Sequence, residues 1–250
     1  TTTAVFEDTS ISFTATFPNG VDLFESTTKA NVLQGANALA VVKDNGETEV
    51  IQFINADLVS ENTIRFSGLL RGRRGTEPYA TGHATGETIA LITTTNSQII
   101  SNPTTALNSP IDYVAPTLGQ LFENAVEFSF TQTGEDLKPY SPVNVQLTNP
   151  GSPDGVDISW VRRTRIGGEL SDGSDVPLSE QFESYEVDIL DAPGGNVLRT
   201  LTTSTENVNY SSADITTDFG SLPSTIDVVV YQISAAVGRG KPAIASLETA

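Results

Sequence analysis

The sequence predicts an all-β protein with two units, a small β-barrel or sandwich followed by a two-sheet Greek-key sandwich. Short runs of apolar residues alternate at period two, threonine and serine are abundant, and 20 glycines and 13 prolines separate the runs. Long helical patterns are nearly absent. A chain of 250 residues has room for one large or two ordinary domains.

The first unit is expected to consist of short strands at residues 11–17, 38–42, 48–53, 58–59, 63–66, 86–92 and 127–131. The pair Asn45 and Gly46 marks the clearest hairpin, because these residues accept the positive φ angles of a tight turn. Residues 101–120 are rich in proline, asparagine, serine and threonine, and they predict an irregular connection. The strand at 127–131 is expected to close the first unit.

The second unit begins after a linker that contains two prolines, at residues 138–142. We therefore place the domains at 1–137 and 138–250. Trp160, the only tryptophan, is expected in the core of the sandwich. Residues 166–182 form a long polar insertion, which indicates a functional loop or a contact surface. Seven strands are expected, at 143–148, 156–162, 184–190, 196–202, 206–210, 226–235 and 243–248.

The composition excludes several classes of function. The net charge of −18 creates a field that repels nucleic acid and anionic membranes. Cysteine is absent, which excludes disulfides, thiolate metal sites and thiol nucleophiles. No signal peptide is recognised, and no apolar run approaches the roughly 18 residues of a membrane span. Because the chain starts at Thr1 and lacks methionine, we expect a fragment or a processed product of a longer polypeptide.

No catalytic residue is predicted. A Ser-His-Asp triad would need His83, the only histidine, and no Gly-x-Ser-x-Gly elbow supplies the serine. His83 is expected to face solvent or to pack in a turn. No pair among the 31 acidic residues stands out for glycoside hydrolysis, although such a pair in a cleft is not excluded. An enzyme acting on cell-wall polymer is therefore kept as a third hypothesis.

No cofactor and no metal are predicted. Gly68, Gly72 and Gly75 superficially resemble a phosphate-binding loop, but no Gly-Lys-Ser/Thr and no helix follow them. Residues 154–157 and 172–175 could offer oxygen ligands to calcium, although neither has the spacing of a known calcium loop. Surface turns also require aspartate and glycine, so turns are the preferred interpretation.

Arginine is concentrated at two places in this acidic chain. The first arginine cluster is Arg71, Arg73 and Arg74, and the second arginine cluster is Arg162, Arg163 and Arg165. One interpretation is recognition of an external anion. The other is pairing with carboxylates of a neighbouring element or subunit, for which the planar guanidinium is well suited. Because the chain is so acidic, we prefer pairing, and we predict that these six side chains stabilise turns or assembly contacts.

The second unit resembles a fibronectin type III domain. The resemblance rests on the strand that carries Trp160, a Tyr-x-Val strand at 185–187, and a Tyr-x-Ile-x-Ala strand at 231–235 that precedes a glycine turn. Fibronectin type III domains are two-sheet sandwiches, so the resemblance agrees with the strand pattern. The polar insertion at 166–182 departs from that family.

A longer resemblance covers roughly residues 35–248. Several motifs match, in order, the C-terminal part of large tail-tip proteins of siphophages and of the related gene transfer agents of alphaproteobacteria. In the first unit the motifs are Phe66-Ser67-Gly68-Leu69-Leu70-Arg71-Gly72-Arg73-Arg74-Gly75-Thr76-Glu77 and the residues 128–131. In the second unit they lie at 137–143, 159–168, 185–189 and 231–240.

The resemblance implies a baseplate hub or central tail-fibre protein, called the megatron protein in gene transfer agents. Such a protein forms a homotrimer around the tail axis, contacts other tail-tip and baseplate proteins, and lies at the distal end of the virion tail. This region would attach to a host cell-surface receptor, for example a polysaccharide. No catalytic residue of the family falls on the matching motifs. The alternative is a glycan-binding accessory module of a secreted or virion carbohydrate-active enzyme, which predicts an exposed aromatic platform.

Overall fold

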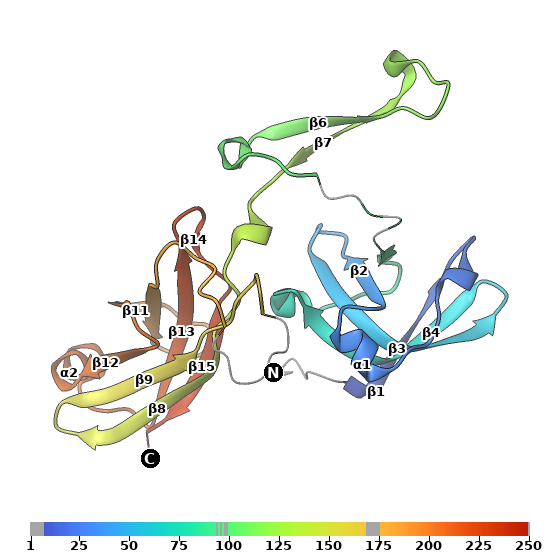
Figure 1. The fold of residues 1–250 in the computed structure, drawn as a ribbon. Coiled ribbons are helices and arrows are strands. Elements are labelled where there is room, and N and C mark those ends of the chain that lie inside the picture. Colours follow the sequence, from blue (N-terminus) through green and yellow to red (C-terminus); the bar gives the residue numbers. More distant parts are fainter. Residues whose placement is uncertain (1–7, 94, 96, 98–99, 169–175, 250) are drawn as a thin grey trace. The chain divides into compact units, whose positions relative to one another are not determined.

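The computed structural model describes residues 8–93, 95, 97, 100–168 and 176–249. The chain divides into two compact units, one within residues 1–99 and one that begins at residue 100, and each is described here by itself (Figure 1). The all-β fold class is confirmed. The described residues contain two short α-helices, α1 (Lys29–Leu33) and α2 (Ser212–Phe219), and the 3₁₀ turns η1 (Val21–Leu23), η2 (Glu77–Tyr79), η3 (Thr104–Ala106), η4 (Phe122–Asn124) and η5 (Glu135–Leu137).

The first unit is one antiparallel sheet with the strand order β1-β4-β3-β2-β5. Its strands are β1 (Asp8–Thr16), β2 (Ala38–Val42), β3 (Thr48–Ser60), β4 (Thr63–Arg73) and β5 (Thr88–Ile92). The edge strands β1 and β5 do not pair with each other in the described part of the chain. Phe13 of β1 and Ile89 of β5 nevertheless pack against the same core around Phe53 and Phe66. The sheet therefore curves around its core as an open barrel.

Two details of this sheet differ from the expected strands. The runs 48–53 and 58–59 belong to one 13-residue strand, β3, and β4 continues through Arg71 to Arg73. The long antiparallel pairing of β3 with β4 supplies partners for backbone groups that the sequence pattern assigned to turns. In the β2–β3 hairpin only Gly46 has a positive φ angle, of 86°. Asn45 instead accepts a hydrogen bond from the Glu47 amide through its side chain.

Strands β6 (Pro110–Ala115) and β7 (Val126–Thr131) form a separate two-stranded hairpin. We expected an irregular connection over 101–120 and a strand at 127–131 that closes the first sheet. The strand at 127–131 is confirmed as β7, but it pairs along its whole length with β6 and does not close the first sheet. The irregular connection is wrong over 110–115, because β6 is a regular strand. By contacts the hairpin groups with the second unit, whereas the predicted domain division lay at residue 137.

The second unit contains a sandwich of two sheets. One sheet has the order β12-β9-β8, and the other has the order β11-β10-β13, with β14 and β15 both paired to β13. This three-plus-four arrangement of seven main strands is that of a fibronectin type III domain, as the sequence predicted. The strands are β8 (Val143–Ser152), β9 (Gly155–Val161), β10 (Tyr185–Leu190), β11 (Val197–Thr203), β12 (Asn207–Ser211), β13 (Thr225–Ser234), β14 (Gly238–Arg239) and β15 (Ala243–Glu248).

The sandwich core forms around Trp160, which is 4% exposed and packs edge-on against Tyr185 at 5.1 Å. The predicted burial of Trp160 is confirmed. Helix α2 was not predicted, although Ser211 caps its N-terminus by accepting a hydrogen bond from the Asp214 amide. Among the described residues no helix is long and apolar enough to cross a membrane.

Candidate functional site

The first arginine cluster lies at the end of β4, where the backbone turns sharply. Gly72, Arg74 and Gly75 have φ angles of 59°, 57° and 78°. A Cβ atom on Gly72 would lie 2.7 Å from the Cα atom of Glu77, so only glycine fits this close approach. The glycines therefore serve backbone geometry here and do not surround a phosphate.

Beneath this turn lies a buried carboxylate, Glu49 of β3, whose side chain is fully buried. It accepts hydrogen bonds from Arg71 Nε at 2.8 Å and Arg71 Nη2 at 2.6 Å, and from the Gly72 amide at 2.7 Å. Burying an acidic side chain is costly unless it is paired, and the bidentate hydrogen bonds from Arg71 offset that cost for Glu49. The carboxylate partner that we expected for the arginine cluster is thus within the same sheet.

His83 extends this network to the loop before β5. Its Nε2 atom lies 2.8 Å from Glu49 Oε2, and its Nδ1 atom lies 2.5 Å from Glu87 Oε2. The ring of His83 thereby connects Glu49 of β3 with Glu87 in the loop before β5. The hydrogen bond from His83 lowers the pKa of Glu87 below its ordinary value.

The other two arginines of the first cluster differ from Arg71. Arg73 donates through Nε to Gln52 Oε1 at 2.7 Å. Gln52 is itself buried, and it donates to the carbonyls of Val32 and Ala36, which ties α1 to the sheet. Arg74 is exposed at the tip of the turn. The cluster thus combines two arginines that hold the sheet together and one that faces solvent.

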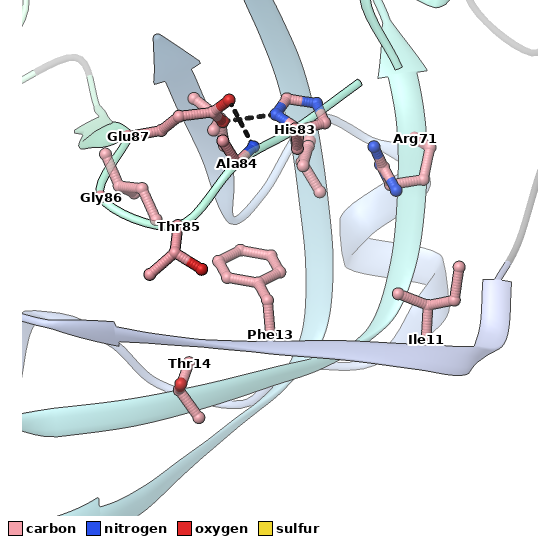
Figure 2. A pocket seen from close by; sticks show the side chains of 12 residues that line it. Ile11, Phe13, Thr14, Arg71, His83, Ala84, Thr85, Gly86 and Glu87 are labelled. Carbon is pink, nitrogen blue, oxygen red and sulfur yellow. Dashed lines mark hydrogen bonds and ion pairs between the residues drawn. The ribbon is translucent and has the colours of Figure 1, made fainter. Parts of the chain in front are cut away.

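A cavity of about 450 Å³ adjoins this network, with a volume in the range of small-ligand sites. One wall is apolar and includes Phe13, Val41 and Ile89, while Arg71, His83 and Glu87 contribute polar groups. Figure 2 shows the Phe13 ring pointing from β1 toward the loop that carries His83 and Glu87. The cavity therefore offers an aromatic surface beside charged hydrogen-bonding groups, which sequence reasoning missed.

The second arginine cluster is distributed over three separate contacts within the second unit. Arg162 Nε lies 3.1 Å from Glu206 Oε1, and Arg165 Nε lies 3.0 Å from Glu180 Oε1. The Arg163 guanidinium lies over the ring of Tyr140, 5.1 Å from its centroid. These arginines hold the loop 162–165 against other parts of the same unit, so the cluster does not form one anion-binding surface.

Two further arginine networks were missed by sequence reasoning. Arg239 pairs with Asp188 at 2.6 Å and with Glu186 at 2.6 Å, and the hydrogen bonds that it donates to Asp188 and Glu186 raise its pKa above the ordinary value despite partial burial. Glu186 and Asp188 stand two positions apart, so they share one face of β10, and this spacing was the available signal. Arg199 pairs with Asp218 at 2.7 Å and joins β11 to α2.

The described residues contain no group of three or more histidine or acidic side chains that could hold a metal ion. In the turn at 154–157, Asp157 accepts a hydrogen bond from Asn209 at 2.8 Å. The other acidic turn considered for calcium, at 172–175, lies outside the described residues. The insertion at 166–182 contains that turn, and its residues 166–168 and 176–182 are described.

The comparisons with known proteins give one family model and two solved structures. A family model described as "Rcc01698-like, C-terminal" matches residues 5–90, roughly a third of the chain. The match spans the first sheet from β1 into β5, including the first arginine cluster. No curated protein matches the chain.

Two solved structures are similar to parts of this chain at low TM-scores. The FN5 domain of Drosophila Lar is 16% identical, with a TM-score of 0.27, over 44% of this chain and 95% of that chain. Domains d3-d4 of the rat CD45 extracellular region are 15% identical, with a TM-score of 0.28, over 78% of this chain and 93% of that chain. At these TM-scores the likenesses say nothing about function, and the sandwich topology rests on its own strand order.

Proposed function

We propose that this chain is a structural component of the tail tip of a phage or gene transfer agent, in the distal region of a baseplate hub or central tail fibre. In this proposal it assembles as a homotrimer, contacts other tail-tip and baseplate proteins, and takes part in attachment to a host cell-surface receptor. A polysaccharide is one receptor class to test. The chain would lie at the distal end of the virion tail.

The proposal rests on the contacts that the arginines of the matching motifs make within their own unit. The motifs that resemble tail-tip proteins include both arginine clusters, and five of those six side chains contact groups of their own unit. Arginines that brace β-modules suit a mechanical component of a particle better than a site that grips a diffusible anion. Rigid modules of this kind also hold loops in place for recognition.

We propose a role without catalysis. His83, the only histidine, is held between two carboxylates and has no nucleophile as a hydrogen-bond partner. The net charge of −18 also makes nucleic acid an unfavourable partner. These features support an interaction protein, and zymography of the purified chain on cell-wall polymer tests the point directly. Clearing that is lost on substitution of one acidic residue contradicts the proposal.

The decisive experiment is to determine the number and position of the copies in an intact particle. We expect three copies at the distal end of the tail, which cryo-electron microscopy of particles carrying a tagged chain would reveal. A tag found on the capsid or along the tail tube, or a chain absent from purified particles, contradicts the proposed role.

The cavity of the first unit favours one alternative function, a glycan-binding accessory module. Its combination of Phe13 with Arg71 and Glu87 offers a sugar ring an apolar face and hydrogen-bonding groups. Trp160 is buried and does not form the exposed aromatic platform that this function needs. A glycan array tests the alternative, with the Phe13→Ala variant as a control. Binding that this substitution abolishes supports the module, and an array without signal contradicts it.

A further inference from the structure

The β6–β7 hairpin has one face that is entirely apolar. The cross-strand pairs Ile111 with Phe130, Tyr113 with Phe128, and Ala115 with Val126 lie on this face. Residues directly opposite each other in an antiparallel pair point to the same side, and every second residue does so along a strand. We call the surface formed by these six side chains the hairpin face. The opposite side carries Pro110, Asp112, Val114, Glu127, Ser129 and Thr131.

The β7 half of the hairpin face is exposed, whereas Ile111 and Tyr113 of β6 are partly buried. Val126, Phe128 and Phe130 are 71%, 54% and 56% exposed. Phe128 stacks on Tyr113 at 5.3 Å, so part of the face is already ordered as a flat aromatic surface. Strands β6 and β7 pair only with each other in the described part of the chain. A lone two-stranded hairpin is at best marginally stable in water, so a partner is expected to cover this side.

The chemistry of the hairpin face restricts that partner. The face carries no charge, and its one polar atom, the Tyr113 hydroxyl, already accepts a hydrogen bond from Asn102 at 2.9 Å. The partner must therefore be apolar as well. Residues 100–137 contain no lysine or arginine, and Asp112 and Glu127 make the opposite side acidic. Two copies of this acidic chain can approach closely only through a surface that is free of charge, and the hairpin face is such a surface.

The exposed apolar surface continues beyond the hairpin face. Leu118, Leu121 and Phe122, in the connection between β6 and β7, are 107%, 64% and 71% exposed. Contiguous apolar patches larger than a few hundred Å² are rare on monomers and mark interaction sites. Three hairpin faces that point toward a common symmetry axis cover one another, and the acidic sides then point outward.

We propose that the hairpin face is covered by the same face of further copies of this chain, so that β6–β7 is a self-association element. The proposal takes only the number of copies from the proposed function, in which the chain is a homotrimer of three copies. The arginine clusters, by contrast, are mostly engaged within their own units. The hairpin thereby takes the assembly role that sequence reasoning gave to the arginines.

The first test measures the mass of the full chain in solution by sedimentation equilibrium over a wide range of concentration. We expect concentration-dependent association, and a dissociation constant raised more than about 10-fold when Phe128→Ser and Phe130→Ser are combined. The matched control combines Glu127→Gln and Thr131→Ser on the opposite side of β7, and it should associate at least as well as the native chain. An unchanged urea transition of the sandwich shows that the variants are folded.

The second test uses the absence of cysteine from the chain. Ala115→Cys places a thiol on the hairpin face, and Val114→Cys places one on the opposite side. A short bis-maleimide should cross-link copies of the Ala115→Cys variant and leave the Val114→Cys variant mostly monomeric. A chain that is monomeric at every concentration, association that survives the double phenylalanine substitution, or equal cross-linking of both cysteine variants would each overturn the proposal. None of these outcomes bears on the position of the chain in a particle, which tests the proposed function separately.

Discussion

The sandwich and the β6–β7 hairpin contain the same kind of strand, yet they treat their apolar sides differently. In β9 the alternating residues Val156, Ile158 and Trp160 are covered by the opposite sheet. In β7 the alternating residues Val126, Phe128 and Phe130 remain more than half exposed, because no second sheet packs on them in the described chain. The comparison teaches that an alternating pattern identifies an apolar side without identifying its cover. The cover is a second sheet in one case and, we propose, another molecule in the other.

The largest expected effect sharpens this contrast. Trp160→Ala should destabilise the sandwich by about 3–5 kcal/mol, because it removes a large buried side chain and leaves a cavity. Phe128→Ala should change the stability of the isolated chain by less than about 0.5 kcal/mol, because its ring is half exposed. Calorimetric unfolding of both variants at low concentration measures the difference. Equal losses would show that the hairpin is part of a folded core, and the comparison would fail.

The next largest loss of stability is expected for Glu49, the buried acidic residue of the first sheet. Glu49→Ala should cost about 3–5 kcal/mol, because it leaves the guanidinium of Arg71 largely buried without its partner. Glu47→Ala, two residues away and paired with Lys43 at the surface, should cost less than about 1 kcal/mol. Urea unfolding measures both. The double variant Glu49→Ala with Arg71→Ala should lose less than the sum of the single losses, since the two groups form one unit.

A smaller effect concerns pH at the base of the hairpin, where η5 meets the sandwich. Burial raises the pKa of Glu135, but hydrogen bonds from Lys138 and Lys241 outweigh it and lower the pKa to about 2. Because the folded-state pKa lies below the ordinary value of 4.5, this contribution to stability is fully present above pH 4.5 and is lost as the pH falls toward 2.

The Glu135→Gln variant tests the direction of this pH dependence. Its stability should approach that of the native chain as the pH is lowered from 5 to about 2, and the difference should be largest above pH 5. Thermal unfolding at a series of pH values provides the measurement. A difference that grows on acidification would contradict the assignment. The lysine contacts would then not favour the ionised carboxylate.

The smallest change in stability is expected for the exposed Arg74 of the first arginine cluster. Arg74→Ala should change stability by less than about 0.5 kcal/mol, because its side chain is exposed. Arg73→Ala, one residue earlier, should cost about 1 kcal/mol through the lost hydrogen bond to Gln52. Parallel urea titrations compare the two. If Arg74→Ala lowers stability more than Arg73→Ala does, Arg74 makes stabilising contacts and does not simply face solvent.

Much of the fold could be predicted because its elements depend on local pattern. The seven main strands of the sandwich lie within a few residues of their expected positions, and Trp160 is buried as expected. Residues 110–115 were taken for an irregular connection because prolines flank them. Pro110 is nevertheless tolerated as the first residue of a strand. Helix α2 was missed because its eight residues are too short to establish a helical period.

The candidate site was less predictable. The arginine clusters were recognised, but their partners lie 22 positions away, as Glu49 does from Arg71, or 44 positions away, as Glu206 does from Arg162. No local rule selects these partners among 31 acidic residues. His83 was interpreted as a turn residue, and it does lie in a loop, yet its two carboxylate partners become apparent only when β3 and the loop before β5 are folded together.

The sequence by itself determined which residues alternate, where glycine and asparagine permit turns, and that positive charge is scarce and clustered. These properties are local, since they depend on backbone sterics and on the period of a strand. Only the tertiary structure decided which carboxylate each arginine meets and which apolar side stays uncovered. Both depend on contacts between residues distant in sequence, and the free energy of burying a charge or an aromatic ring is set by those contacts.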